Sequence, residues 1–308
     1  MAIYIVQFTH QGKQHTLTPI ERRNGVKEWN TGEHRRKFMI AEGRYVLNGS
    51  KSLSGKQDLL FWGEWEPMSK IEKTYHFKDY TVNPKYLHSP FLKINKKGIV
   101  QHVVFKGTSK VASLVGGSKH VCSNYQNTDP FVFDDSFFYS CCKQSFKTMR
   151  QLDPGSIILF GSTILNAQNG GPYFALDTVF VVGESRDYTA GTYKTDLAGF
   201  IPPYYDQIMG FSSWKNPIQP YTCYKGASFN QPVEDMFSFV PCQVADNELT
   251  GFPRVILNQR QLCFIVDNLN SAPKIKPVSL ASNKAAWDKI CQIVKSQHFE
   301  LGVRFWYK

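Results

Sequence analysis

Short apolar segments bounded by turn residues constrain the fold of this chain more than any other feature. Such segments recur between Gly, Pro, Asn and Asp residues along most of the 308 residues, and this spacing is typical of β-strands. Helical patterns are fewer, so strands and helices do not alternate regularly. We therefore predict an α+β fold, with a β-rich mixed sheet or barrel-like core, few helices and a C-terminal helix. Strands are expected in residues 2–8, 43–49, 58–66, 98–105, 154–162, 173–183, 236–244, 260–268 and 302–307, and helices in 144–152 and 282–299, the second with Ser282 as N-cap.

Positive charge is concentrated in the first part of the chain. The net charge is +11; residues 1–120 contain 20 Lys and Arg against 9 Asp and Glu, whereas residues 121–308 contain 16 of each. A localised basic field attracts polyanions such as nucleic acid, although a solvated surface is the alternative interpretation. We predict a basic, nucleic-acid-facing β-rich segment (1–120) and a neutral α+β segment with the pocket (121–308), or one continuous domain. The residues expected to hold DNA phosphates are His34, Arg35, Arg36, Lys37, Lys96 and Lys97.

Neither membrane insertion nor secretion is predicted. The longest apolar runs are far shorter than the roughly 20 residues that span a bilayer, and the N-terminus lacks the features of a signal peptide. The seven cysteines include no C-x-x-C pair, which favours scattered reduced thiols over disulfides or zinc. We expect a cytoplasmic protein that does not bind membranes.

The segment "LLFWGEWEP" (59–67) places two tryptophans beside two carboxylates. Side chains of a strand alternate between its faces, so Trp62, Glu64 and Glu66 are expected on one face, with Phe61 and Trp65 on the other. One face then carries an indole next to two acids, which suits a stacked base beside a catalytic carboxylate.

Two further segments contain candidate catalytic carboxylates. In "NTDPFVFDDSFFYSCCKQ" (127–144), aromatic residues surround Asp134 and Asp135; they either stack a base or fill a core. Asp177 lies inside an otherwise apolar strand pattern. A buried carboxylate must be paired or hydrogen-bonded, so Asp177 is either a functional group or a structural one.

Sequence motifs exclude several enzyme classes. No P-loop, G-x-G-x-x-G, G-x-S-x-G or H-E-x-x-H pattern is present. Nucleotide hydrolysis, dinucleotide use and a serine-hydrolase elbow are therefore unsupported, and no cofactor or metal is expected.

The segments "WGEWEP", "TDPFVFDD", "FYSCCKQ", "PGSIILFGS" and "FALDTVFVV" carry a resemblance. Together they resemble an uncharacterised bacterial family associated with modified nucleotides and phage defence, and defence DNA glycosylases that remove hypermodified bases. "NTDPF" is also similar to the G-Q-D-P-Y loop of uracil-DNA glycosylases, with Asp129 matching the acid and Phe131 the aromatic residue. Asn127 and Thr128 depart from that motif, and "HSPF" (88–91) lies upstream, where the family has its second motif downstream. "PGSIILFGS" also resembles small β-barrel modules that bind RNA or modified bases in an aromatic cage.

These observations lead to one preferred function and two alternatives. We predict a DNA-binding enzyme, a glycosylase that flips and excises a hypermodified base. The first alternative is a non-catalytic reader of modified DNA or RNA that uses Trp62 and Trp65. The second is a Mg-dependent nuclease with Asp134, Asp135 and Asp177 as metal ligands. For the glycosylase, the catalytic candidates are Glu64, Asp129, Asp177, Glu66 and Asp135, and the base-binding candidates are Trp62, Trp65, Phe131 and Tyr139.

Overall fold

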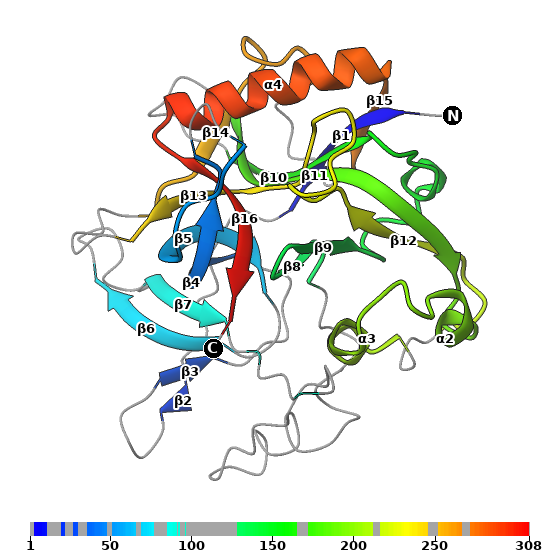
Figure 1. Cartoon of the computed structure of the whole chain (residues 1–308), viewed down its shortest axis with the longest axis horizontal. Coiled ribbons are helices and arrows are strands. Elements are labelled where there is room, and N and C mark those ends of the chain that lie inside the picture. Colours follow the sequence, from blue (N-terminus) through cyan, green and yellow to red (C-terminus); the bar gives the residue numbers. More distant parts are fainter. Residues whose placement is uncertain are drawn as a thin grey trace.

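The predicted fold class is confirmed. The computed structural model is rich in strands, with mixed sheets, a small closed barrel and few helices, including one near the C-terminus (Figure 1). It describes residues 3–10, 20–21, 27–29, 36–47, 51–65, 69–76, 85–90, 92, 96, 128–164, 172–211, 216–245, 252–266 and 272–307.

The first sheet combines strands from distant parts of the chain. Strand β1 is parallel to β10, and the remaining pairs are antiparallel. The strand order is β15 (Lys274–Pro277), β1 (Tyr4–Thr9), β10 (Ile157–Ile164), β11 (Tyr173–Tyr188), β12 (Tyr221–Gly226), β9 (Ser136–Tyr139) and β8 (Phe131–Phe133), with β14 (Val255–Leu257) also paired to β11.

The second sheet contains the barrel. Its order is β16 (Glu300–Trp306), β13 (Val240–Val244), β5 (Gln57–Glu64), β4 (Arg36–Tyr45), β7 (Lys85–Pro90), β6 (Ser69–Tyr75), β3 (Lys27–Trp29) and β2 (Ile20–Glu21). Strand β16 also pairs with the end of β4, which closes a ring of β4, β5, β13 and β16. The start of β4 pairs in parallel with β7, so this long strand lies beside β7 at its start and beside β16 at its end.

The C-terminal helix α4 (Leu280–Ser296) begins earlier than predicted. Its N-cap is Ser279, whose side chain accepts a hydrogen bond from the backbone N–H of Ser282. The assignment of Ser282 as the cap was therefore wrong, because Ser279 is the serine whose hydroxyl meets the unpaired N–H groups of the first turn. Helix α4 covers one face of the first sheet and extends from the side of β14 to the side of β15 (Figure 1).

Two other expectations about elements differ from the structure. Residues 144–152 contain only the 3₁₀ helix η2 (Lys147–Arg150), and residues 260–266 form turns instead of a strand. The strand expected in 98–105 lies outside the described residues. The remaining short helices, α2 (Tyr193–Asp196) and α3 (Pro203–Met209), follow β11.

The first part of β11, residues 174–182, is mostly apolar because both of its faces are buried. Phe180 and Val182 contact one large apolar cluster, whereas Val179 and Val181 contact another, which also contains the buried face of α4. A strand covered on both sides needs apolar residues at successive positions, so it loses the alternation of a half-exposed strand.

The described strands do not separate into groups at residue 120. Strand β1 belongs to the sheet of β10 and β11, and β13 and β16 belong to the sheet of β4 and β5. The expected boundary itself falls in residues 101–127, outside the described part of the chain, so the division of the chain stays a prediction. Cys141, Cys142, Cys223, Cys242, Cys263 and Cys291 are free thiols, and Cys122 is not described.

Candidate functional site

A buried charged pair forms where β4 and β5 run side by side. The register of these strands places Arg36 opposite Glu64, and Phe38 opposite Trp62. Because side chains two residues apart share a face, an ion pair and an aromatic pair lie next to each other. Arg36 Nη1 is 3.5 Å from Glu64 Oε2, and both side chains are 1% exposed. The predicted alternation is confirmed here, since Trp62 packs in a different apolar cluster from Phe61 and Trp65.

Asp177 of β11 joins this pair from the other sheet. The β10–β11 register shifts between Phe160 and Gly161, which leaves Asp177 without a partner position on β10. Such a bulge turns a side chain away from its regular direction. The carboxylate accepts from Arg254 Nη2 at 2.6 Å through Oδ1, and its Oδ2 is 3.2 Å from Arg36 Nε. Asp177 therefore links an arginine of the barrel to an arginine beside β14.

Arg254 is held by more than its ion pair. Its Nη2 also donates to the hydroxyl of Ser162 at 3.1 Å and to the carbonyl of Ala175 at 3.3 Å. Burial lowers the pKa of Arg254, and the neighbouring Asp177 carboxylate opposes that shift. The guanidinium also lies 5.0 Å from the centroid of the Trp62 ring, within the range of a cation–π contact.

Trp62 contacts neighbouring groups along its ring instead of presenting an open face. Phe38 and Phe252 lie 5.6 and 6.4 Å from it between ring centroids, and the Arg254 guanidinium lies 5.0 Å from its centroid. Its Nε1 is buried and has no hydrogen-bond partner among the described residues. The indole can thus offer a bound molecule a hydrogen bond more readily than a stacking surface.

His10 and Lys143 bring two more basic groups to the cluster. His10 follows β1, and its Nε2 is 3.6 Å from Glu64 Oε2. Lys143 follows β9, and its Nζ donates to the carbonyl of Thr9, the residue before His10. Burial lowers the pKa of Lys143 to about 8, the Arg36 charge adds to this shift, and Glu64 and Cys142 oppose it. We define His10, Arg36, Glu64, Trp62, Lys143, Asp177 and Arg254 as the seam cluster, because it lies between the two sheets.

The seam cluster contains only part of the predicted site. Glu64, Asp177, Trp62 and Arg36 come together, but Glu66, His34, Arg35 and Lys97 lie outside the described residues. Sequence reasoning missed His10, Lys143 and Arg254 as parts of a common site. One sequence signal points to Lys143, which is the single Lys or Arg in the aromatic and cysteine-rich segment 127–144.

Asp129 has a structural environment. Its carboxylate accepts backbone N–H groups from Ser140, Cys141 and Cys142 at 2.8 to 3.0 Å. Burial raises the pKa of Asp129, and these hydrogen bonds oppose that rise. The side chain thereby anchors the turn that carries Lys143, and its predicted catalytic role remains a prediction.

The other aromatic candidates contribute to the apolar core. Trp65, Phe131 and Tyr139 are each at most 1% exposed and belong to one apolar cluster. Trp65 lies 4.8 Å from Tyr307, and Tyr139 stacks on Tyr224 at 5.6 Å between ring centroids. Contact with a base would require these rings to leave their neighbours.

The carboxylates of the nuclease alternative lie in two places. Asp134 and Asp135 pair with Arg304 at 3.1 and 3.4 Å, whereas Asp177 pairs with Arg36 and Arg254. Within the described ranges, no group of three His, Cys, Asp or Glu side chains has a metal-binding arrangement. The three aspartates therefore do not converge.

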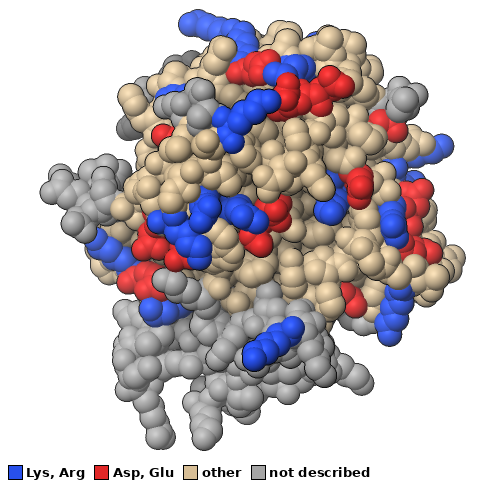
Figure 2. Space-filling view, viewed as in Figure 1, with Lys and Arg blue, Asp and Glu red and all other residues tan. Residues whose placement is uncertain are grey.

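The expected phosphate contacts divide between the interior and the surface. Arg36 and Lys37 are buried, Lys37 Nζ lies 3.5 Å from the hydroxyl of Ser69, and Lys96 is exposed. On the face drawn in Figure 2, lysines and arginines are interspersed with acidic residues. Ten of the 20 Lys and Arg residues in 1–120 lie outside the described part of the chain.

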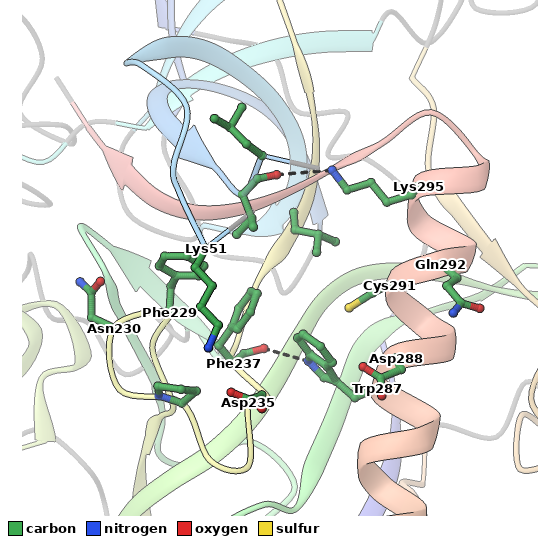
Figure 3. A pocket seen from close by; sticks show the side chains of 14 residues that line it. Lys51, Phe229, Asn230, Asp235, Phe237, Trp287, Asp288, Cys291, Gln292 and Lys295 are labelled. Atoms are coloured by element: carbon green, nitrogen blue, oxygen red, sulfur yellow. Dashed lines mark hydrogen bonds between the residues drawn. The ribbon is translucent and has the colours of Figure 1, made fainter. Parts of the chain in front are cut away.

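A groove of about 1060 Å³ lies between α4 and residues 229–237. Phe229, Phe237 and Trp287 form apolar walls, and Lys51, Asp235 and Lys295 add charges (Figure 3). The Trp287 indole already donates to the carbonyl of Phe237 at 3.0 Å. The sequence-predicted site residues do not line this groove. Val46, which does, directly follows Tyr45, the last residue of β4, whereas Arg36 is the first residue of that strand.

Comparison of the chain with protein-family models, with curated proteins and with solved structures finds no match. The resemblance to defence glycosylases therefore stays an expectation. In the described ranges no helix is long and apolar enough to cross a membrane.

Proposed function

We propose that the protein is a DNA glycosylase that cleaves the N-glycosidic bond of a hypermodified base, with Glu64 as its catalytic carboxylate. One observation carries this proposal: a buried carboxylate shares a cluster with buried N–H donors that have no hydrogen-bond partner within the described residues, on Trp62 and on Arg36 Nη2. Unsatisfied buried donors cost free energy, so their presence beside Glu64 favours a ligand-binding site over a purely structural one.

The neighbours of Glu64 suit the charge that develops when a base leaves. As the bond from C1′ to the base nitrogen breaks, positive charge spreads over C1′ and the ring oxygen of the sugar. A carboxylate stabilises that charge and orients the water whose hydroxyl adds to C1′, while the departing base takes the proton. Arg36 and His10, 3.5 and 3.6 Å from Glu64 Oε2, hold the carboxylate in place.

Asp177 serves this proposal as a positioning residue. Its two oxygens face Arg254 and Arg36, so its charge balances those guanidinium groups inside the protein. By fixing Arg36, Asp177 also fixes the partner of Glu64. The buried Trp62 Nε1 supplies a donor for an acceptor on the flipped base.

The test is base release from modified DNA. Hypermodified phage DNA and unmodified DNA of the same sequence are incubated with the protein in EDTA, treated with alkali and run on a denaturing gel. We expect alkali-labile breaks in the modified DNA alone. The variant E64Q should lower the rate by about 100-fold or more, because a general acid–base or electrostatic group contributes at least that much.

The matched control is E72Q, which changes an exposed carboxylate of β6 that pairs with Lys70. This variant should cleave like the wild type and melt near the wild-type temperature. E64Q leaves the buried Arg36 charge less well compensated, so it should melt at a lower temperature while staying folded at the assay temperature. If E64Q retains full activity, the assignment of Glu64 is wrong. Modified DNA that is shifted on a native gel but stays intact indicates the reader, and breaks that need Mg²⁺ and no alkali indicate the nuclease.

A further inference from the structure

Lys143 is held at the edge of the seam cluster by a rigid turn. Its backbone φ is 60°, and the two preceding residues donate their N–H groups to the buried Asp129 carboxylate. A non-glycine residue with positive φ is uncommon and persists where surrounding contacts hold it. The turn therefore fixes the direction in which the lysine side chain leaves the backbone.

The amine of Lys143 lies at the same end of β1 as Glu64. Its Nζ is 4.5 Å from the centroid of the Phe8 ring and donates to the carbonyl of Thr9. On the same Phe8 ring, His10 stacks at 4.9 Å between centroids, and His10 in turn contacts Glu64. The amine and the proposed catalytic carboxylate thus approach one small region from different strands.

The local charges favour a reactive amine. Burial lowers the pKa of Lys143 to about 8, with Arg36 and Lys274 adding to the shift and Cys142 and Glu64 opposing it. A substantial fraction of the amine is then neutral near pH 8. A neutral amine keeps two N–H donors, so it can retain the bond to Thr9 while its lone pair attacks a carbonyl carbon. Desolvated lysines beside a second cation are the ones that form Schiff bases.

We propose that Lys143 is a nucleophile that forms an imine with the C1′ aldehyde of an abasic deoxyribose in DNA. This inference rests on the proposed function, since base excision produces that sugar. It goes further by assigning the enzyme a covalent intermediate and a second substrate.

Imine formation balances with the amine of Lys143 and the sugar aldehyde alone, because one water molecule leaves. The Nζ lone pair attacks C1′ of the open-chain aldehyde, a C–N bond forms, and the aldehyde oxygen leaves as water with both amine protons, which gives the neutral imine. Protonation of that imine makes C1′ electrophilic. Sodium borohydride then delivers hydride to C1′, and the product is a stable secondary amine that joins protein to DNA.

The experiment uses the full chain and a duplex with a single abasic site, incubated with sodium borohydride. We expect a covalent protein–DNA species on a denaturing protein gel, and peptide mass spectrometry should locate it at Lys143. K143R should lose this species, because a guanidinium remains protonated and does not attack. The matched control K147R changes an exposed lysine one turn further on and should be trapped like the wild type.

The inference is wrong if the wild type gives no adduct, if K143R is trapped as efficiently as the wild type, or if the adduct maps to another lysine. Mapping on the wild type keeps the test valid even if K143R folds poorly. Failure of this inference is distinguishable from failure of the proposed function. Base release without an adduct would refute only the imine proposal. An adduct at Lys143 without base release from modified DNA would refute only the glycosylase proposal.

Discussion

At the residue scale, the three acids that are buried among the described residues differ in what surrounds them. Asp129 accepts three backbone N–H groups, and Asp177 faces two arginines. Glu64 lies 3.5 and 3.6 Å from Arg36 and His10, longer than the strong charge-assisted bonds of Asp177. The first two acids have structural tasks in the fold, and our proposal assigns catalysis to Glu64 because it shares its cluster with the buried donors of Trp62 and Arg36 that have no hydrogen-bond partner in the described ranges.

Lys143 supports a prediction about pH and stability. Its pKa is lowered from 10.5 to about 8 in the folded protein, so between those values the unfolded chain binds more protons than the folded one. Stability therefore rises with pH across that window, because the folded protein no longer carries a buried ammonium group. We expect this contribution to be absent in K143M.

The measurement is the free energy of unfolding in urea between pH 7.5 and 10.5 for both proteins. The difference, wild type minus K143M, should increase with pH. A difference that stays constant or falls would contradict the lowered pKa. Tyrosines that titrate in the same range affect both proteins and cancel in the comparison.

At the element scale, the bulge between β10 and β11 decides where the site forms. Gly161 lies at the register shift, and a Cβ there would overlap the carbonyl oxygen of Ala175 and lie 2.7 Å from the Phe174 ring. Only glycine permits this close approach of the two strands. The bulge in turn directs Asp177 toward Arg36.

The variant G161A should therefore destabilise the protein by about 1–3 kcal/mol, the usual cost of forcing extra atoms into a packed interior. G55A is the control, because a Cβ at Gly55 meets nothing within 4 Å. It should change the free energy of unfolding by less than about 0.5 kcal/mol. Both are measured by urea denaturation, and equal effects of the two substitutions would show that the strand contact does not need glycine.

At the scale of the whole molecule, buried charges join the two sheets. Arg36 belongs to the barrel and Asp177 to the other sheet, and their side chains are at most 1% exposed. Removing one partner of such a pair leaves the other buried charge less well compensated, which is more costly than removing both. Energetic coupling between the sheets is therefore expected at this contact.

A double-mutant cycle with R36M and D177L measures that coupling. Each single variant should lower the free energy of unfolding by about 3–5 kcal/mol. The double variant should lose about 1–3 kcal/mol less than the sum of the two. K56M and E42L, which remove a partly exposed pair 2.7 Å apart, form the control cycle, with an expected coupling below about 1 kcal/mol. Strict additivity for Arg36 and Asp177 would mean that the sheets are not coupled through them.

Local patterns in the sequence were sufficient to predict much of the fold. The alternation in residues 59–66 placed Trp62 and Phe61 on opposite faces, and the apolar spacing after residue 280 predicted α4. Both depend on short-range periodicity, which a strand or helix imposes on its own neighbours. The fold class followed from the same periodicities.

The composition of the site was decided by tertiary structure alone. Asp177 and Arg254 are 77 residues apart in the chain, and Lys143 meets Thr9 across 134 residues. These contacts depend on the pairing of distant strands and on one bulge, neither of which leaves a periodic trace in the sequence. The sequence by itself therefore determined which side chains share a strand face. Only the packing of the two sheets determined which carboxylate meets which cation.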